Sequence, residues 1–349
     1  MRLLDYAPVN MLAIFGDRLS PVCREFMKWS GGKFSMIDRT GTLDLGLQLM
    51  PVTPIPELAP VGTFAQCMDE RAVEIIATGR PLNMYWSGGI DSTSALVALM
   101  KAGVTPEQLT VNYTFASLFE YERFFKDHID GRFPTRKLNG TVMTDVTTDK
   151  LIVTGEMGDQ VFGSVKTLSM YQASPSEARA TAWKDAVPDF SDEAMAQLEQ
   201  LVAIAPWKIE DAYDFLWWIS FTCKWQHVYF RMGNKLAAPY ESYVNALTHF
   251  FCTDTFQRWS MDPANRYEKC DVTWESYKLK AKEYIYDFTG DEVYLATKRK
   301  VGSLPTHSTG HFLMRVEGGE LVSFGQNSDS KLAYGKLYGD RFDGIFKGE

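Results

Sequence analysis

The middle of the chain alternates between short apolar runs and longer stretches with helical periodicity. Runs of apolar, aromatic or β-branched residues with the length of a strand occupy three places: residues 84–86, 109–116 and 151–153. Stretches whose apolar positions repeat with a helical period occupy three more: residues 64–78, 94–102 and 120–129. This alternation predicts a parallel α/β sheet, in which ligands bind at the carboxyl ends of the strands.

The two ends of the chain have different patterns. Residues 1–65 predict an irregular, partly β segment that ends in a proline-rich linker at 51–56. The last part of the chain is expected to be mainly helical, with aromatic-rich stretches at 212–230 and 250–259. Aromatic residues at helical spacing indicate core packing rather than a binding site. Residues 312–324 alternate around a Gly-Gly pair and predict a β-hairpin.

The segment between the first predicted strand and the next helix reads SGGIDST, at residues 87–93. Glycine lets backbone N–H groups approach a phosphate closely, serine hydroxyls add donors, and the start of a helix favours anions. The carboxylate of Asp91 would repel a phosphate, but it suits a Mg²⁺ ion that joins carboxylate and phosphate oxygens. The sequence therefore predicts a nucleotide phosphate site, the alternative being a capped Gly-Gly turn without a ligand. No GxxxxGK[ST] loop is present.

A second glycine-rich segment follows the strand predicted at residues 151–153. It contains Gly155, Glu156 and Asp159, with further glycines at positions 158 and 163. Because it begins where a strand ends, it is expected at the ligand-binding edge of the same sheet. The alternative is a glycine-rich loop whose acidic residues are merely exposed.

Both segments carry a family resemblance. Residues 87–92 resemble the SGGxDS loop of the ATP pyrophosphatases (PP-loop enzymes), which split ATP between the α and β phosphates. Residues 155–164 are similar to the GEGxDELFGG signature of asparagine synthetase-type enzymes, and five positions match: Gly155, Glu156, Asp159, Phe162 and Gly163. Met157, Gln160 and Ser164 depart from it. The resemblance spans about residues 70–305 and implies an adenine nucleotide alpha hydrolase-like, parallel-sheet PP-loop domain.

The later motifs of that family are matched more weakly. In a segment similar to GxExRxPFLD, the glutamate falls on Lys235 and the arginine on Ala237, so the roles of those two residues do not transfer. Residues 277–282 resemble the KxxLR helix, with lysine in place of arginine. Residues 298–303 are similar to the loop that supplies the catalytic lysine, which would be Lys300.

The resemblance implies a role for each matching residue. Mg²⁺ would be held by Asp91 and Asp159, and Glu156 and Lys300 would be catalytic. The residues implied to bind ATP are Ser87, Gly88, Gly89, Asp91, Ser92, Thr93 and Gly155. Residues 109–114 occupy the place where family members bind adenine, and they are a candidate for that contact.

Composition narrows the class of protein. The chain has 349 residues, of which 45% are hydrophobic, enough for a large core. Its net charge of −8 argues against a broad electrostatic grip on nucleic acid. The five cysteines form no CxxC pair, so neither a zinc site nor a disulfide framework is expected. No signal sequence and no long apolar run is seen, so a cytoplasmic protein without membrane contact is expected.

The resemblance implies an ATP-dependent, AMP-forming amide ligase that adenylates a carboxylate and passes it to an amine or ammonia. Position 2 is Arg2 rather than the cysteine of a glutaminase, so ammonia would come free, as a substrate amine, or from a separate glutaminase. The substrates would be small molecules, with a peptide or protein left open. The alternatives are adenylation of a base carbonyl in a nucleotide or nucleic acid, and ATP binding without catalysis. Three parts are expected: residues 1–65, a synthetase-like domain at 66–305, and a hairpin-containing tail at 306–349.

Overall fold

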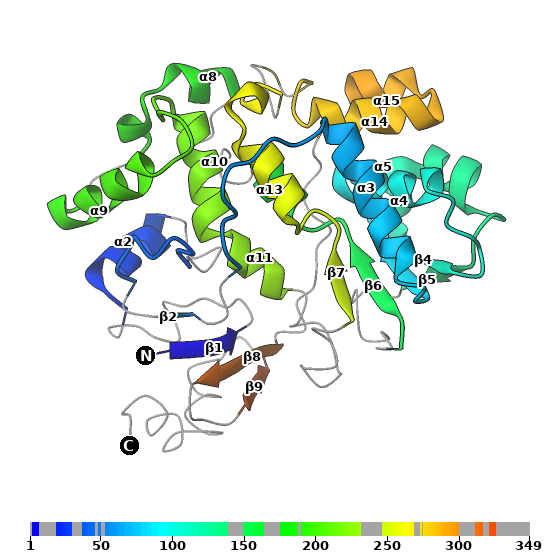
Figure 1. Cartoon of the computed structure of the whole chain (residues 1–349), viewed down its shortest axis with the longest axis horizontal. Coiled ribbons are helices and arrows are strands. Elements are labelled where there is room, and N and C mark those ends of the chain that lie inside the picture. The colour runs from blue at the N-terminus through cyan, green and yellow to red at the C-terminus, as the bar shows by residue number, and fades with distance from the viewer. Residues whose placement is uncertain are drawn as a thin grey trace.

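The structure is a computed structural model (Figure 1). It describes these residues: 2–6, 19–29, 37–45, 48–49, 53–138, 149–163, 175–187, 190–231, 246–268, 273, 275–299, 311–316 and 321–325. The strands are β1 (Arg2–Tyr6), β2 (Gln48–Leu49), β3 (Leu82–Tyr85), β4 (Leu109–Tyr113), β5 (Thr135–Lys137), β6 (Leu151–Thr154), β7 (Leu247–His249), β8 (His311–Val316) and β9 (Leu321–Gly325).

Helices make up much of the rest of the described chain. The α-helices are α2 (Pro21–Trp29), α3 (Phe64–Ala77), α4 (Ile90–Lys101), α5 (Phe115–Phe124), α6 (Gly158–Phe162), α8 (Pro175–Ala180), α9 (Asp192–Ala203), α10 (Ala212–Cys223), α11 (Trp225–Arg231), α13 (Asp254–Met261), α14 (Leu279–Thr289) and α15 (Glu292–Thr297). Shorter helical turns are η2 (Phe125–Ile129), η3 (Trp183–Ala186) and η5 (Pro263–Asn265). None of the helices in the described parts has the length and apolar character needed to cross a bilayer.

The central sheet has five strands, all parallel, in the order β5-β4-β3-β6-β7. Every residue of β3 and β6 is buried, as expected for parallel strands covered on both faces. The chain builds outward from β3 through β4 to β5 and then returns to the other side of β3 at β6. The strand order therefore reverses between β3 and β6, and open α/β sheets bind ligands outside the carboxyl ends of the strands at such a reversal. The predicted parallel α/β sheet is confirmed.

A second sheet joins the two ends of the chain. Its order is β2-β1-β8-β9, and β8 and β9 form the antiparallel hairpin expected from the sequence. β1 pairs antiparallel with β8, with Tyr6 opposite Met314. The irregular N-terminal segment and the C-terminal hairpin thus share one sheet, which lies at the lower end of the view in Figure 1.

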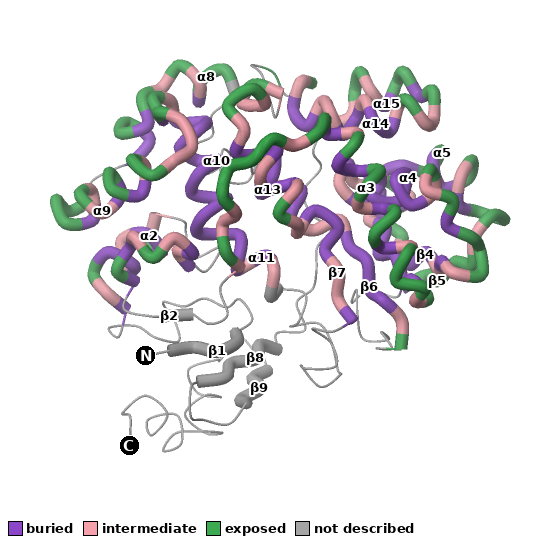
Figure 2. The backbone as a smooth tube through the Cα atoms, in the orientation of Figure 1, coloured by how far each residue is buried: buried purple, intermediate pink, exposed green. Residues whose placement is uncertain are grey.

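The helical part forms an aromatic core beside the central sheet (Figure 1). All twelve residues of α10 are buried, and Figure 2 shows buried backbone running through α10 and β6. Trp217, Trp218 and Trp225 are at most 2% exposed, which confirms that this aromatic stretch packs in the core. Elsewhere α14 and α3 pack against α4, the helix that follows the SGGIDST turn.

Some predicted boundaries are wrong. The strand expected over 109–116 ends at Tyr113, because Thr114 caps a helix: its hydroxyl oxygen accepts a hydrogen bond from the backbone N–H of Ser117. The aromatic stretch at 250–259 becomes helical only at Asp254, after a cap at Thr253. The strands β5 and β7 were not expected, since each has only three residues, and the helix α2 was not expected because the N-terminal segment was predicted to be irregular.

Candidate functional site

The turn between β3 and α4 is held by its own serine hydroxyls. Ser87 Oγ and Ser92 Oγ lie 2.8 Å apart, and Ser92 Oγ also accepts a hydrogen bond from the Ser87 backbone N–H at 3.0 Å. Ser87 Oγ in turn accepts from the Gly89 N–H at 3.3 Å. Gly89 is the N-cap of α4 and has no side chain to cap it, and the start of a helix favours an anion.

Gly88 cannot be replaced without moving its neighbours. Its φ of +75° lies in the left-handed region, and a Cβ there would sit 2.3 Å from the backbone oxygen of Ser117. The Cβ of Glu120 would be 2.6 Å away. Helix α5 therefore lies directly against the turn, and only glycine allows this approach.

The segment after β6 interlocks with the same turn. A Cβ at Gly155 would lie 2.5 Å from the Ser92 nitrogen, and a Cβ at Gly158 would lie 2.4 Å from Asp91 Cγ. Both predicted glycine-rich segments thus pack against one another at the carboxyl ends of β3 and β6. This contact places Asp91, in the first turn of α4, beside Asp159, in the first turn of α6.

A buried lysine joins these two carboxylates. Lys278 Nζ lies 2.5 Å from Asp91 Oδ2 and 2.7 Å from Asp159 Oδ1. The Lys278 side chain is 2% exposed, whereas the two carboxylates are 22% and 20% exposed. Burial alone would lower the pKa of Lys278, but the charges of Asp159 and Asp91 outweigh it and raise this pKa above its usual value. The lysine is therefore a charged ammonium in the folded protein.

Backbone strain is concentrated at this point. Among the described residues, the two non-glycine positions with positive φ are Met157, at 77°, and Lys278, at 54°. Each costs about 1–2 kcal/mol in an L-residue. Met157 precedes α6 and stands where the resembling signature has glycine, and Lys278 precedes α14. Strained residues of this kind gather at functional sites, because the surrounding contacts must hold them.

The residues around α14 and α15 close the back of the site. The Tyr277 hydroxyl donates to the Gly163 oxygen at 2.9 Å and to Asp159 Oδ1 at 3.3 Å. The ring of Tyr294 stacks on Tyr121 with a centroid distance of 4.1 Å. Burial, and then the nearby Tyr121, Asp91 and Glu120, raise the pKa of Tyr294, so its phenol stays protonated.

Lys298 fixes the start of the basic segment to the same region. Its ammonium forms an ion pair with the Glu120 carboxylate and donates to the Glu120 backbone oxygen at 3.1 Å. Both side chains of the pair are about a tenth exposed, at 9% and 11%. Because Glu120 also borders Gly88, the segment that leads to Lys300 is anchored beside the turn. Lys300 itself lies outside the described residues, as do Lys235 and Ala237.

The other predicted residues take different positions. Thr93 is fully buried, and its hydroxyl oxygen accepts a hydrogen bond from Trp86 Nε1 at 3.0 Å, so its side chain faces the core. Glu156 is half-buried, and its backbone N–H donates to the Thr154 hydroxyl at 3.2 Å. The candidate adenine segment is β4 with its cap, and its Tyr113 and Thr114 end at the same edge of the sheet as the turn.

Sequence reasoning missed the residues that the structure adds at the carboxylate pair. Tyr277 and Lys278 lie in the segment that resembles a KxxLR helix, but no role was assigned to either. That match was a usable signal for Lys278. Tyr277 carried none, because its contacts depend on an approach of α14 to α6 that the sequence does not encode locally.

The donor set suits a magnesium ion shared with a phosphate. Mg²⁺ is bound through one or two carboxylates, with water and phosphate oxygens completing the octahedron. Asp91 and Asp159 supply the two carboxylates, and Gly88, Gly155 and Gly158 let the surrounding segments pack closely enough to bring them together. In the described parts of the chain, no three His, Cys, Asp or Glu residues are grouped for a metal. The described residues thus show no metal site built from three or more of these side chains, and at the Asp91–Asp159 pair phosphate oxygens and water would have to supply the remaining ligands.

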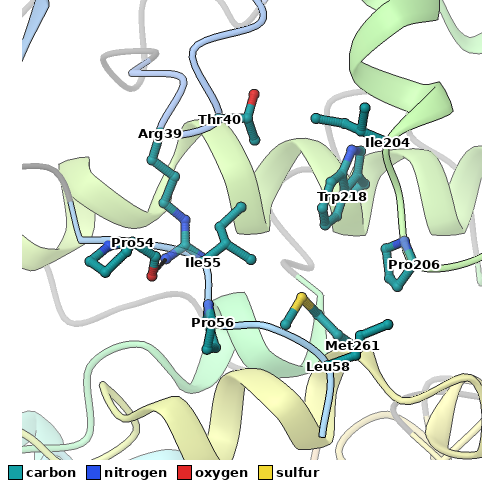
Figure 3. Close-up of a pocket in the computed structure, with 10 residues that line it drawn as sticks. All are labelled: Arg39, Thr40, Pro54, Ile55, Pro56, Leu58, Ile204, Pro206, Trp218 and Met261. Atoms are coloured by element: carbon teal, nitrogen blue, oxygen red, sulfur yellow. Dashed lines mark hydrogen bonds between the residues drawn. The ribbon is translucent and has the colours of Figure 1, made fainter.

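A separate pocket of about 430 Å³ lies away from these residues (Figure 3). Its lining is mainly apolar: Arg39, Thr40, Pro54, Ile55, Pro56, Leu58, Ile204, Pro206, Trp218 and Met261. None of the residues predicted for the phosphate site lines it. Arg39 anchors the segment that contains Thr53 and Pro54, which forms one wall of the pocket. Its Nη1 donates to the backbone oxygens of both residues at 3.4 Å. The pocket is thus a space beneath a tethered segment.

Comparison with known proteins does not assign the chain to a family. No model of a known protein family matches it, and no curated protein sequence does.

Proposed function

We propose that this chain is an ATP-dependent, AMP-forming amide ligase of the PP-loop type. It adenylates a carboxylate and transfers the acyl group to an amine or ammonia. The observation that carries the proposal is the convergence of two glycine-rich segments at the strand-order reversal, which sets Asp91 and Asp159 on one cation. A triphosphate and its magnesium ion need this combination of close backbone N–H groups, a helix start and paired carboxylates.

The proposed chemistry uses what these residues can do. The β and γ phosphates bind to the Gly88 N–H, and to the Gly89 N–H and the Ser92 hydroxyl after these two exchange their contacts inside the turn for phosphate oxygens. The substrate carboxylate attacks the α-phosphorus, the bond to the pyrophosphate oxygen breaks, and pyrophosphate leaves. An amine then attacks the acyl carbon, loses a proton and expels AMP. Mg²⁺, when bound, neutralises the developing pyrophosphate charge, and a cation such as Lys300 stabilises the second step.

The decisive test is the pair of products made from Mg-ATP. The purified protein is incubated with pools of amino acids and other carboxylates, with and without ammonia or amines, and AMP and pyrophosphate are measured. AMP with pyrophosphate, dependent on both a carboxylate and an amine, supports the proposal. ADP as the product contradicts it. Product that requires a nucleotide or nucleic-acid substrate instead supports adenylation of a base carbonyl.

ATP binding without catalysis has one observation in its favour. Lys278 already contacts both carboxylates and cancels one of their two negative charges, as expected in a protein that binds nucleotide without a metal-dependent reaction. Tight binding of ATP with no AMP in any pool, including pools with a glutaminase and glutamine, would favour that function.

The second step is tested at Lys300. In Lys300→Ala we expect nucleotide binding within about twofold of wild type and a loss of amide product, because the cation acts on the acyl-transfer step rather than on the phosphates. Isothermal titration with a non-hydrolysable ATP analogue and a product assay measure the two effects. The matched control is Lys280→Ala, a lysine on α14 that is 34% exposed. Unchanged product yield in Lys300→Ala removes Lys300 from the mechanism.

A further inference from the structure

The position of Lys278 raises a question about metal binding. Its ammonium contacts both carboxylates at 2.5 and 2.7 Å. A magnesium ion bound by the same oxygens would stand about 2.0–2.1 Å from each. Two cations that close together repel strongly in a site largely shielded from water. Lys278 and a divalent ion therefore cannot occupy the carboxylate pair in the same way at the same time.

The backbone of Lys278 has a strained conformation, which surrounding contacts must hold in place. The residue has a φ of 54°, a left-handed conformation that a lysine adopts only under constraint. It precedes α14 without a side-chain cap, inside a turn in which the Leu279 N–H donates to the Ser276 oxygen at 3.1 Å. The contacts of the ammonium with the two carboxylates therefore coincide with a strained backbone position.

A polyphosphate offers the ammonium a new partner. The glycine-rich turn lies within the same packed unit, because Gly158 touches Asp91 and Gly155 touches Ser92. Phosphate oxygens bound at the turn would bring several negative charges next to Lys278. The ammonium could then exchange the carboxylates for phosphate oxygens while the metal takes its place.

We propose that Lys278 is a built-in competitor of the divalent ion, so that the Asp91–Asp159 pair accepts the ion only together with a polyphosphate. The inference rests on the proposed function, since it takes the turn at residues 87–92 as a polyphosphate site. It adds an order to binding: the free metal is excluded, and metal and nucleotide bind with positive coupling. Lys278 is here a positioning residue, which acts through the occupancy of the two carboxylates.

The first experiment measures Mn²⁺ alone. Binding to the nucleotide-free protein is followed by electron paramagnetic resonance at pH 8 for wild type, Lys278→Met and Lys280→Met. Methionine keeps most of the length of lysine without its charge, and Lys280 is a partly exposed lysine on the same helix, paired with Glu268 and Glu283. We expect Lys278→Met to bind Mn²⁺ at least tenfold more tightly than wild type, and Lys280→Met to match wild type. Equal or weaker binding by Lys278→Met overturns the proposal.

The same variants give a second readout through stability. Removing the ammonium leaves two carboxylates facing each other, so Lys278→Met should melt at a lower temperature than wild type without metal. Added Mn²⁺ should recover most of that loss in Lys278→Met and change the wild-type melting temperature little, because only the variant has a free site. Recovery to the same extent in both proteins, or in neither, contradicts the proposal.

A measurement on wild type covers the case in which Lys278→Met does not fold. In protein labelled with ¹⁵N-lysine, the buried ammonium of Lys278 should give a slowly exchanging NH₃⁺ resonance, identified by its loss in Lys278→Arg. We expect 5 mM Mg²⁺ alone to leave this resonance in place, and Mg²⁺ with α,β-methylene-ATP to shift it. A resonance that is unmoved when the analogue is bound shows that the lysine keeps the carboxylates, which overturns the proposal.

Failure of the inference can be told from failure of the proposed function. If calorimetry shows no binding of Mg²⁺ with α,β-methylene-ATP to any variant, the nucleotide site itself is wrong. If the analogue binds but Lys278→Met has wild-type affinity for Mn²⁺, only the competition is wrong.

Discussion

Two buried cations in this molecule are held in opposite ways. Lys278 pairs with Asp91 and Asp159 near the carboxyl ends of β3 and β6, and their charges keep its pKa above the usual value. Arg39 is 8% exposed and has no carboxylate within ion-pair distance in the described part of the chain. Its guanidinium carbon lies 4.6 Å from the Phe221 ring centroid and 4.4 Å from that of Trp225, and burial lowers its pKa.

The hydrogen-bond acceptors of the two cations also differ: those of Arg39 are neutral, and those of Lys278 are charged. Arg39 Nε donates to the Phe221 oxygen at 3.1 Å, and Nη1 donates to Gln257 Oε1 at 2.6 Å. These neutral acceptors and aromatic faces tie separate segments together and need no ligand. Lys278 is bound by carboxylates that remain partly open to solvent. The proposed exchange of ions thus concerns the cation held by partly exposed carboxylates, whereas the cation held by backbone oxygens links segments of the fold.

The largest effect is expected from removing one of the carboxylates that bind Lys278, which tests whether this cation differs in function from Arg39. In Asp91→Ala we expect the rate of AMP and pyrophosphate formation to fall more than about 100-fold, beyond the usual effect of changing an outer-shell partner of a metal. The fold should survive, because Lys278 keeps its contact with Asp159. Asp192→Ala, which removes an exposed aspartate from the first turn of α9, is the control. Normal pyrophosphate release by Asp91→Ala would exclude Asp91 as a metal ligand.

The converse experiment removes the structural cation. Arg39→Met leaves the oxygens of Phe221 and Gln257 without their donor, so the free energy of unfolding should fall by about 2–4 kcal/mol. Urea denaturation measures the loss, and Lys208→Met, at an exposed surface lysine, is the control. Mn²⁺ should restore none of it. A recovery with Mn²⁺ like that expected for Lys278→Met would show that the two cations are not different in kind.

Two glycines sharpen the distinction between a functional turn and a structural one. Gly88 and Gly103 both have positive φ, at +75° and +83°, but a Cβ at Gly103 meets nothing within 4 Å. Alanine at either position costs about 1–2 kcal/mol from the backbone alone. Only Gly88→Ala should also push α5 from the turn, and its affinity for a non-hydrolysable ATP analogue should fall at least tenfold by calorimetry. Equal affinity in the two variants would separate the turn from nucleotide binding.

The sequence predicted the parts of the site that depend on local pattern. The turn after β3 and the segment after β6 were found because glycine, serine and aspartate followed recognisable strands. We could expect the two segments to converge, because the carboxyl ends of parallel strands meet at the same edge of a sheet. What Asp91 and Asp159 contact was not predictable, because Lys278 approaches them from a helix more than a hundred residues away. The role of Arg39 was equally hidden, since its partners are backbone oxygens of a distant helix and an irregular segment.

Backbone strain marks the other limit of sequence reasoning. Met157 has positive φ at a position where the resembling signature has glycine, so its side chain alone gave no sign of the conformation. The strand predicted through residue 116 failed for a related reason: a local cap at Thr114 overrode an apolar run. In both cases a short-range hydrogen bond or a tight contact decided the backbone, and periodicity does not detect either.

The smallest effect concerns a third cation, which lies between the two extremes. The Lys298–Glu120 pair is about a tenth exposed, while the Lys184–Glu199 pair is more than half exposed. Lys298→Met should reduce the free energy of unfolding by about 1–2 kcal/mol, because Glu120 is left shielded and unpaired beside Gly88. Lys184→Met should lose less than about 1 kcal/mol.

The same Lys298→Met variant also tests whether this pair serves the site. Urea denaturation gives the stability change, and a product assay under saturating ATP gives activity. Because Lys298 anchors the segment that leads to Lys300, we expect amide formation to fall several-fold with little change in nucleotide affinity. A loss of stability with full product formation would class Lys298 with Arg39, as a structural link. A loss of product with unchanged stability would instead class it with Lys278, as a cation whose contacts serve the reaction.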